Sequence, residues 1–385
     1  MDNSFSIRPI KSLIVLLTNR CNLACPYCFE SKDSKRMSLE VAKDVLHFLH
    51  NNSNTPSFTF FGGEPTLEWD SIMRPLIEYS HTLDNPTRFS MTTNGTMLDE
   101  ERVDYLINNN VSFLLSMDGQ KFTQDINRPM RSGKSGFDKL EIILPYILSK
   151  RPHQEVRATL TGLSVKNLFD DILWFETIGV KSLMIEPNVY EVMSDSYKNE
   201  LYNQIQRYEE YIINSFRAGI QPLLFRGYAA SFWRIKMALS ASGRRNMSGC
   251  APTQKCGFGI LGSGSSDVNG NIYGCHHVGL DPDSIWCIGN IYDGVNEEKV
   301  RTLVAMYNEQ MVGNEQCALC PLDNICDGGC TPNNWMTSGD MHKVPETFCY
   351  WTRCITDSAY RVCQVLGNEN NALFSETFAT SNIRR

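Results

Sequence analysis

The chain contains 385 residues, of which 42% are hydrophobic, and its formal net charge is −7. This length allows two or three domains with ample core, and the acidic balance argues against nucleic acid as a partner. No apolar stretch approaches the roughly 18 residues needed to span a bilayer, and residues 1–10 lack a secretion signal. We therefore expect a cytoplasmic protein with no membrane partner, whose 14 cysteines bind metal rather than form disulfides.

Between residues 11 and 187, short apolar runs alternate with segments of helical period. The expected strands are 12–17, 57–61, 88–92, 111–117, 155–160 and 181–186. The expected helices are 38–50, 70–82, 99–109, 137–148 and 168–178. These six β/α repeats predict an α/β fold with a parallel sheet and helices outside it. Periodicity alone does not decide between a doubly wound sheet and part of a barrel.

The chain divides into four expected parts. Residues 1–190 hold the β/α repeats, and residues 191–248 form a largely helical bridge. Residues 249–365 are rich in cysteine and glycine and have few periodic runs, which predicts a unit organised around metal. Residues 366–385 are expected to form a mobile tail.

The most informative local pattern is a loop of three cysteines, Cys21, Cys25 and Cys28, directly after the first expected strand. Three thiolates can hold three irons of a four-iron, four-sulfur cluster and leave the fourth iron open to a small molecule. This spacing, with Tyr27 before the last cysteine, resembles the signature loop of radical S-adenosylmethionine (SAM) enzymes. The resemblance implies that the open iron and the loop bind SAM. A structural zinc loop, or three unrelated core cysteines, is the alternative.

A second group of cysteines resembles the SPASM pattern that extends many radical SAM enzymes acting on peptides and proteins. The resemblance implies two auxiliary clusters, the first bound by Cys250, Cys256, Cys275 and Cys330. The second would be bound by Cys317, Cys320, Cys326 and Cys349, with Cys354 as a rival for the last position. It also implies a partial six-stranded (β/α)6 barrel followed by a cysteine-rich, cluster-organised SPASM domain. Spacing alone does not distinguish these sites from a double zinc ribbon.

Further segments at expected strand ends resemble SAM-binding elements of the same family, since β/α folds place ligands at the carboxyl ends of their strands. The GGEP-type turn would bind the methionine amine through Glu64 or nearby carbonyls, and Arg157 would pair with the carboxylate of SAM. The candidate cofactor-binding residues are Tyr27, Gly62, Gly63, Glu64, Pro65, Thr93, Asn94, Ser116, Asp118, Arg128, Arg157 and Ile185. Turn-forming or ion-pairing roles are the alternatives for several of them.

The resemblance implies that reduced flavodoxin or ferredoxin supplies an electron, that SAM yields a 5′-deoxyadenosyl radical, and that the radical abstracts hydrogen from a peptide or protein substrate. Two auxiliary clusters favour net oxidation of that substrate. A non-enzymatic iron–sulfur electron-transfer protein is the alternative from another class, but it would need a fourth ligand beside the three-cysteine loop.

The overall layout is similar to that of anaerobic sulfatase maturases, which make formylglycine, with two departures. His276 stands where that group has a carboxylate proposed as base, and Phe61 stands where it has Gln. His276 can still serve as the catalytic base. We therefore expect a maturase that installs a thioether or carbon–carbon crosslink in a ribosomally made peptide, with formylglycine formation as the alternative. Only 20 residues precede the loop, so a separate leader-binding protein is one expected partner.

Overall fold

The computed structural model describes residues 7–239, 262–310, 317, 319–322, 325–326 and 328–379. Cys250 and Cys256, predicted as ligands of the first auxiliary cluster, lie outside the described residues. Across the described part of the chain, ten strands form one sheet in the order β10-β9-β8-β7-β1-β2-β3-β4-β5-β6. No helix within this part has both the length and the apolar character needed to cross a membrane.

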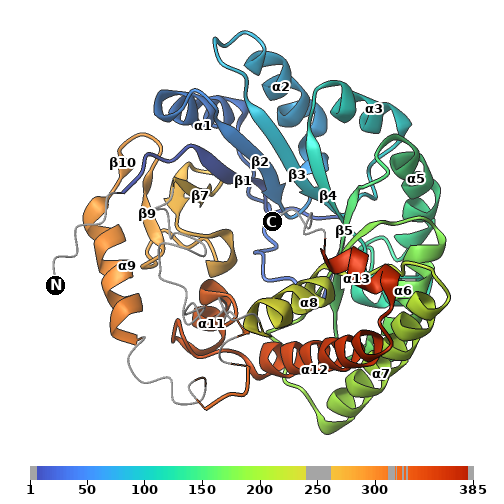
Figure 1. Ribbon diagram of the computed structural model, residues 1–385. Helices are drawn as coiled ribbons and strands as arrows, with labels where there is room; N and C mark the ends of the chain where they lie inside the picture. Colours follow the sequence, from blue (N-terminus) through green and yellow to red (C-terminus); the bar gives the residue numbers. More distant parts are fainter. Residues whose placement is uncertain are drawn as a thin grey trace.

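Six parallel strands make up the first part of this sheet among the described residues. They are β1 (Ser12–Thr18), β2 (Ser57–Gly62), β3 (Arg88–Thr93), β4 (Ser112–Ser116), β5 (Glu155–Leu160) and β6 (Ser182–Pro187). The helices that follow them are α1 (Leu39–Asn52), α2 (Arg74–Ser80), α3 (Glu100–Asn108), α4 (Lys121–Asn127), α5 (Phe137–Lys150) and α6 (Leu168–Thr177). Figure 1 shows the strands curving together with helices around the outside, which confirms the predicted partial (β/α)6 barrel.

Alternating burial explains why these segments form strands under helices. In β5, Val156, Ala158 and Leu160 are buried, whereas Arg157 and Thr159 are half-buried and line the interior of the barrel. Side chains on alternate residues of a strand point to opposite faces. Strand β5 therefore buries an apolar row against helices and presents polar side chains inward.

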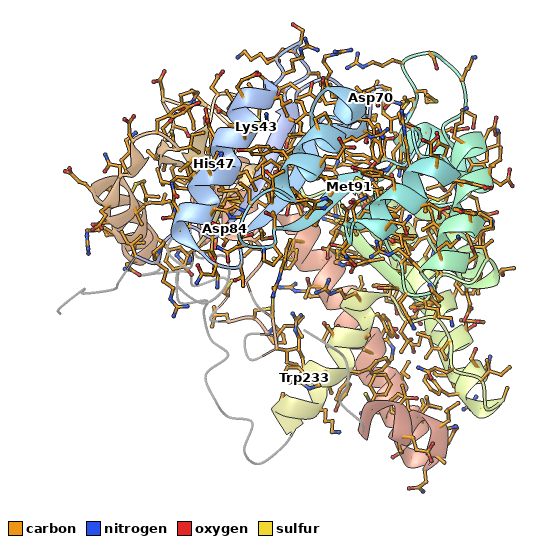
Figure 2. All side chains as sticks on the ribbon, turned by 90° about the horizontal axis from the view of Figure 1, so that it is seen from above. Lys43, His47, Asp70, Asp84, Met91 and Trp233 are labelled. Atoms are coloured by element: carbon orange, nitrogen blue, oxygen red, sulfur yellow. The ribbon has the colours of Figure 1, made fainter. Side chains whose placement is uncertain are left out.

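Local capping fixes where two helices begin. Ser38 accepts a hydrogen bond from the backbone of Val41 at the start of α1, and Asp99 accepts one from Arg102 at the start of α3. The helices expected from the sequence at 38–50 and 99–109 start at these two residues. Figure 2 shows Lys43 and His47 on α1 beside α2, where both reach Tyr79, with Lys43 Nζ 4.6 Å from its ring centroid.

The cysteine-rich part extends the same sheet rather than forming its own. Strand β7 (Ser263–Ser266) pairs in parallel with β1, so that Ser12 lies opposite Ser263. Antiparallel pairing then adds β8 (Asn271–Tyr273), β9 (Cys287–Asn290) and β10 (Gly294–Val295). The distal segment is thus joined to the barrel by backbone hydrogen bonds.

The remaining α-helices of the described residues come from the bridge and the C-terminal part. They are α7 (Asp195–Arg217), α8 (Arg226–Leu239), α9 (Glu297–Gln310), α11 (Thr331–Ser338), α12 (Glu346–Asn368) and α13 (Ala372–Ala379). Figure 1 shows α12 running alongside α7 and α8. Arg361 of α12 forms a two-pronged ion pair with Glu209 of α7, and Tyr228 of α8 hydrogen-bonds Ser358 of α12 at 2.7 Å.

The predicted mobile tail is wrong for residues 366–379. Leu366 is a fully buried residue of α12, and α13 docks on the bridge through Phe374, whose ring centroid lies 5.3 Å from Phe216 and 5.6 Å from Phe232. An eight-residue helix is too short to be stable alone. Its order depends on aromatic partners more than 130 positions earlier, which local patterns do not reveal.

Phe374→Ala should therefore destabilise the protein by about 3–5 kcal/mol, because it removes a large side chain from an aromatic cluster that cannot easily collapse. Urea denaturation would measure the change. Ile142→Ala, at a side chain that is 77% exposed, is the matched control and should change stability by less than about 0.5 kcal/mol. Equal effects of the two substitutions would contradict the docking of α13.

Candidate functional site

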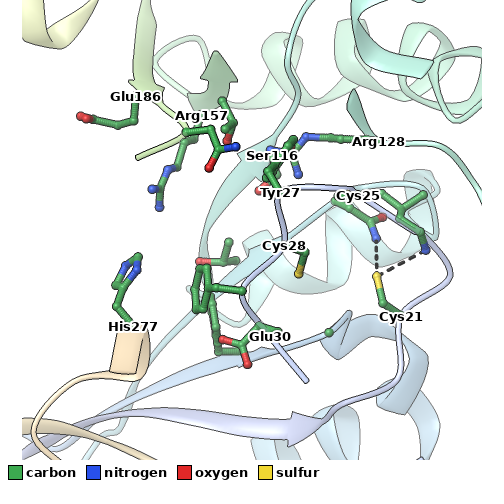
Figure 3. Close-up of a pocket in the computed structure, with 18 of the residues that line it drawn as sticks. Cys21, Cys25, Tyr27, Cys28, Glu30, Ser116, Arg128, Arg157, Glu186 and His277 are labelled. Carbon is green, nitrogen blue, oxygen red and sulfur yellow. Dashed lines mark hydrogen bonds between the residues drawn. The ribbon is translucent and has the colours of Figure 1, made fainter. Parts of the chain in front are cut away.

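A pocket of about 1050 Å³, part of it open to solvent, lies at the carboxyl ends of the barrel strands. Figure 3 shows the cysteine loop along one side and residues from β4, β5 and β6 along another. Its lining comprises Cys21, Leu23, Cys25, Tyr27, Cys28, Phe29, Glu30, Phe61, Gly62, Gly63, Glu64, Thr92, Thr93, Asn94, Ser116, Arg128, Arg157, Thr159, Glu186, Pro187, Asn188, Val189, Tyr190, His276, His277 and Asn333. Most of the predicted cofactor-binding residues thus meet in one place.

All three cysteines of the loop line this pocket, and none forms a disulfide. Cys21 Sγ accepts hydrogen bonds from Leu23 N–H at 3.4 Å and from the Asn94 amide at 3.9 Å (dashed in Figure 3). Burial raises the pKa of the Cys21 thiol to about 11, and the neighbouring Cys25 and Cys28 add to the rise. The three thiols therefore share one environment. Within the described residues, no three His, Cys, Asp or Glu side chains are arranged to hold a single metal ion.

A buried carboxylate holds the loop against the strands. Asp118, which follows β4, accepts hydrogen bonds from the Tyr27 hydroxyl at 2.7 Å and from Thr159 N–H at 2.8 Å, and it pairs with Arg128 at 2.9 Å. The Arg128 guanidinium also lies 5.5 Å from the Tyr27 ring centroid. Asp118 itself does not line the pocket. The predicted contact between Asp118 and SAM is therefore replaced by a structural role, because protein donors already surround its carboxylate.

The short helix α4 sets the position of Arg128. The side chain of Gln124 accepts a hydrogen bond from Asp118 N–H, and Asp171 of α6 accepts hydrogen bonds from Gln120 N–H and the Thr123 hydroxyl. Asp171 thereby holds the start of α4, and Arg128 follows its last residue. Burial raises the pKa of Asp171 to about 7.

The paired glycines allow the end of β2 to approach the cysteine loop. A Cβ on Gly62 would lie 2.3 Å from the Thr18 carbonyl, and one on Gly63 would lie 2.2 Å from the Arg20 carbonyl. Gly62 also has φ of +131°, a conformation that residues with a side chain rarely adopt. Glycine is thus required here for contact between two backbone segments of the protein itself.

Glu64 is 1% exposed, and its carboxylate accepts hydrogen bonds from Thr66, Thr93 and Asn94. Burial raises its pKa, and these hydrogen bonds oppose the rise. Four donors occupy the acceptor positions of the carboxylate. Of the two predicted acceptors for an ammonium group, the nearby backbone carbonyls therefore fit this structure better than Glu64. Pro65 lies in the following helical turn, is buried and does not line the pocket.

Two arginines offer donors to a ligand. Figure 3 shows Arg157 of β5 directed into the pocket beside Ser116 of β4. The Nε atom of Arg128 is buried without a hydrogen-bond partner among the described residues. These donors fit a ligand that carries a carboxylate.

The prediction that Ile185 packs against adenine does not fit the geometry. Ile185 is 3% exposed and borders a separate small cavity against Ile172 and Phe175 of α6. Its neighbour Glu186 faces the pocket instead. Because alternate residues of a strand face opposite sides, an error of one residue in assigning the inward side exchanges the two roles.

An aromatic group joins the barrel to the distal segment. Phe61, at the end of β2, lies 4.8 Å from His276 between ring centroids, and Phe29 stacks on His277 at the same distance. Burial lowers the pKa of His276 well below its usual value, with Arg157 and His277 contributing, and it lowers the pKa of His277 to about 4. Both imidazoles are therefore neutral at physiological pH.

Several pocket residues were not predicted from the sequence, namely Phe29, Glu30, Glu186, Asn188, Tyr190, His277 and Asn333. Burial raises the pKa of Glu30 to about 8, and its Oε1 atom has no hydrogen-bond partner among the described residues. The Tyr190 hydroxyl donates to Asn333 at the start of α11, which ties the loop after β6 to the distal segment. Glu30 could have been found from its position two residues after Cys28.

The described cysteines of the two predicted auxiliary ligand sets lie in two places. Cys275 and Cys330 both raise the pKa of Tyr190, after the larger effect of burial, so both lie near that side chain. Burial and the neighbouring Cys326, Cys317 and Cys320 thiols raise the pKa of Cys349 to about 11. Burial raises the pKa of the Cys354 thiol, and the groups that shift it further are Tyr350, Asp357 and Arg361 rather than other cysteines. This arrangement favours Cys349 over Cys354 as the fourth member, and the cluster-binding role of these cysteines stays a prediction.

Residues 15–156 match the model of the Radical SAM superfamily, and this span runs from within β1 to the start of β5 and includes the cysteine loop. The chain belongs to the radical SAM superfamily. The family implies a four-iron cluster and SAM as cofactors. The three-thiol loop fits the cluster, and Arg157 together with the unpartnered Nε of Arg128 fits the carboxylate of SAM. The pocket at the carboxyl end of the barrel is where the cofactors of this radical SAM enzyme would bind.

Relatives match over most of the chain. A cysteine-type anaerobic sulfatase-maturating enzyme of Clostridium perfringens is 26% identical over 341 residues, which cover 84% of this chain and 89% of that enzyme. An uncharacterised protein of Methanocaldococcus jannaschii is 30% identical over 225 residues, which cover 53% of this chain and 74% of that protein.

Solved structures share the fold. "Native anSMEcpe with bound AdoMet and Cp18Cys peptide" aligns with a TM-score of 0.70 and 23% identity, covering 94% of this chain and 100% of that one. SuiB of Streptococcus suis bound to its precursor peptide SuiA aligns with a TM-score of 0.59 and 16% identity, covering 89% and 76%. The protein is thus a radical SAM enzyme related to anaerobic sulfatase maturases, and its fold is shared with peptide-bound enzymes.

The raised pKa of Asp171 predicts a pH dependence of stability. Between about pH 4 and pH 7 the native carboxyl keeps its proton while the unfolded one is ionised, so this group lowers the free energy of unfolding as pH rises through that range. In Asp171→Asn this decrease in the free energy of unfolding with rising pH should disappear. The free energy of unfolding should then fall less steeply, by up to about 1.4 kcal/mol per pH unit. Urea denaturation across the range would measure it.

Asp170→Asn is the matched control, because Asp170 lies next along the helix with its side chain about half exposed and pairs with Arg207. It should keep the wild-type slope. If Asp171→Asn also keeps that slope, the buried, proton-holding environment of Asp171 is ruled out.

Proposed function

We propose that this radical SAM enzyme oxidatively modifies a side chain of a peptide or protein substrate, installing a thioether or carbon–carbon crosslink in a ribosomally made peptide. The observation that carries the proposal is the contact between Phe61 and His276. These are the two positions at which the chain departs from the sulfatase-maturase layout. They are more than 200 residues apart in sequence, yet both line the same wall of the pocket.

This contact changes the chemistry available beside the substrate. A carboxylate base and a Gln side chain would make that wall anionic and hydrogen-bonding, whereas Phe61, His276, Phe29 and His277 make it aromatic. An aromatic wall favours an apolar or aromatic substrate side chain by burial of apolar surface. A carbon–carbon crosslink joins such side chains without a carboxylate to deprotonate a substrate thiol or hydroxyl at this position. A thioether crosslink forms a sulfur–carbon bond and releases the thiol proton, which His276 would have to accept.

Each part of the pocket has a proposed task. The thiols of Cys21, Cys25 and Cys28 hold the cluster, and Arg128 and Arg157 hold the carboxylate of SAM. When bound, these cofactors supply a 5′-deoxyadenosyl radical that takes hydrogen from an unactivated C–H bond. The aromatic wall orients the substrate and keeps water away from the reacting carbon. His276 would accept a substrate proton through its neutral imidazole nitrogen as a weak base, because burial lowers its pKa.

The proposed partners follow from the same chemistry. A reduced flavodoxin or ferredoxin supplies the electron that SAM cleavage consumes. The substrate's leader segment is held by the bridge helices, the distal segment or a separate leader-binding protein. The proposed auxiliary clusters bound by the distal cysteines accept the electron that the oxidised substrate releases, and a cytoplasmic location fits a reduced, iron-dependent enzyme.

Formylglycine formation is the second candidate, and the similarity to the sulfatase-maturating enzyme of Clostridium perfringens over 84% of the chain favours it. In that reaction a peptidyl Cys or Ser becomes an aldehyde. His276 would then have to replace the carboxylate as base for the substrate thiol or hydroxyl. A crosslink removes two hydrogen atoms from the peptide and leaves no aldehyde. Formylglycine made from Cys loses the sulfur, and formylglycine made from Ser loses two hydrogen atoms, but both carry an aldehyde.

The decisive experiment uses anaerobically reconstituted full-length protein with dithionite, SAM and candidate peptides. Mass spectrometry should detect 5′-deoxyadenosine and a peptide that has lost two hydrogen atoms and does not react with an aldehyde-trapping hydrazide. A hydrazide-reactive aldehyde, made by loss of sulfur from Cys or of two hydrogen atoms from Ser, would instead establish the second candidate. Absence of 5′-deoxyadenosine from iron-loaded protein would reject both and favour an electron-transfer protein.

Replacing Cys317 and Cys320 by Ala should spare part of the SAM cleavage and abolish the modified peptide, because these thiols are proposed to bind an electron-accepting cluster. Replacing Cys28 should abolish SAM cleavage as well. Cys363→Ala is the matched control at a half-buried thiol of α12 outside both predicted ligand sets, and it should keep product formation. Wild-type product yield from the double variant would contradict a role for the distal cluster.

A further inference from the structure

One arginine of α12 is directed at a cysteine rather than at a carboxylate. Arg353 Nη2 donates to Cys320 Sγ at 3.8 Å. Within the described part of the chain, Arg353 is in none of the ion pairs found, and Asp357, four residues later on α12, acts on it only at longer range and more weakly than the sulfurs of Cys320 and Cys349. Eight residues later on the same helix, Arg361 has the usual kind of partner, since it forms a two-pronged ion pair with Glu209. The guanidinium of Arg353 is therefore available to the sulfur site.

Helix geometry places Arg353 beside the whole group of sulfurs. Cys349 and Arg353 are four residues apart in α12, so they lie on the same face of the helix one turn from each other. After the larger effect of burial, the thiols of Cys326, Cys317 and Cys320 raise the pKa of Cys349, so these sulfurs lie near it. A single helical turn thus supplies both a sulfur ligand and a permanent positive charge to the same site.

The surroundings of this group are open to solvent. Arg353 is an exposed residue, and Leu319, which precedes Cys320, is 86% exposed. A positive charge at the surface normally stabilises the folded protein only slightly. Stability of the fold therefore does not explain the contact of Arg353 with the Cys320 sulfur.

An N–H···S hydrogen bond from a charged donor acts on the electronic state of an iron–sulfur site. Hydrogen bonds to the sulfurs and nearby charge are among the main determinants of cluster reduction potential. Reduction adds one negative charge to the cluster, and a guanidinium beside a ligand sulfur stabilises the more negative state. Its removal should make the site harder to reduce.

We propose that Arg353 is a positioning residue that raises the reduction potential of the iron–sulfur site formed by Cys317, Cys320, Cys326 and Cys349. This inference rests on the proposed function, because it assumes the second auxiliary cluster. Arg353 touches neither substrate nor SAM in this assignment. It tunes the distal site toward accepting an electron, which is the direction that oxidation of the substrate requires.

The test isolates one site in the full-length chain. A background in which Cys21, Cys25, Cys28, Cys275 and Cys330 are replaced by Ala leaves only the second ligand set complete. After anaerobic reconstitution this background should carry about four irons per chain. An electron paramagnetic resonance titration against poised redox buffers then gives the midpoint potential of that site alone.

Arg353→Gln in this background should retain the iron and lower the midpoint potential by about 59 mV, which is a tenfold change in the one-electron equilibrium. Arg353→Lys keeps the positive charge but lacks the planar guanidinium, and it should shift the midpoint potential less. The shift should be the same at about pH 7 and about pH 9, because a guanidinium stays protonated throughout. Arg361→Gln is the matched control on the same helix and should lower thermal stability without moving the potential.

Three results would overturn the proposal. The first is an unchanged midpoint in Arg353→Gln with full iron content. The second is loss of iron from Arg353→Gln together with an unshifted midpoint in Arg353→Lys, which would make the role purely structural. The third is a background protein that binds no iron or binds zinc, which removes the ligand set as well. SAM cleavage by the otherwise intact enzyme is measured separately, so failure of this inference and failure of the proposed function remain distinguishable.

Discussion

The site depends on one buried carboxylate. Asp118 is 5% exposed and binds Tyr27 of the cysteine loop, Arg128 after α4 and the backbone of Thr159 in β5. A buried charge is tolerated only when its partners are in place, and removing one partner of such a pair is strongly destabilising. The strands therefore position Asp118, and Asp118 fixes the loop on which the three thiols stand.

A second constraint comes from the distal segment, which completes the pocket instead of forming a separate body. Pairing between β1 and β7 brings the cysteine-rich part beside the first barrel strand. His276 and His277 then meet Phe61 and Phe29, and Asn333 meets Tyr190. Radical chemistry needs a site that orients one C–H bond and excludes water, and a wall contributed by both halves of the chain provides such enclosure.

Much of this arrangement follows from patterns in the sequence. The six barrel strands lie within two residues of their expected bounds, because buried parallel strands are bounded by glycine, polar turns and helix caps that act locally. The pocket residues at the ends of β2, β3 and β4 could be located for the same reason. The inward side of β6 could not be located in this way. Ile185 ends an apolar run and Glu186 follows it, and only the pairing of β6 with β5 in the folded sheet decides which of the two faces the pocket.

By itself, the sequence determined the class of the protein and its initiating chemistry, because the spacing of Cys21, Cys25 and Cys28 within one loop is a local property. Tertiary structure alone decided what surrounds that chemistry. The contact of Phe61 with His276, the docking of Phe374 on the bridge helices and the placement of Arg353 on Cys320 each join residues from separate elements. Such contacts arise from packing and charge pairing across the folded chain, and no local pattern encodes them.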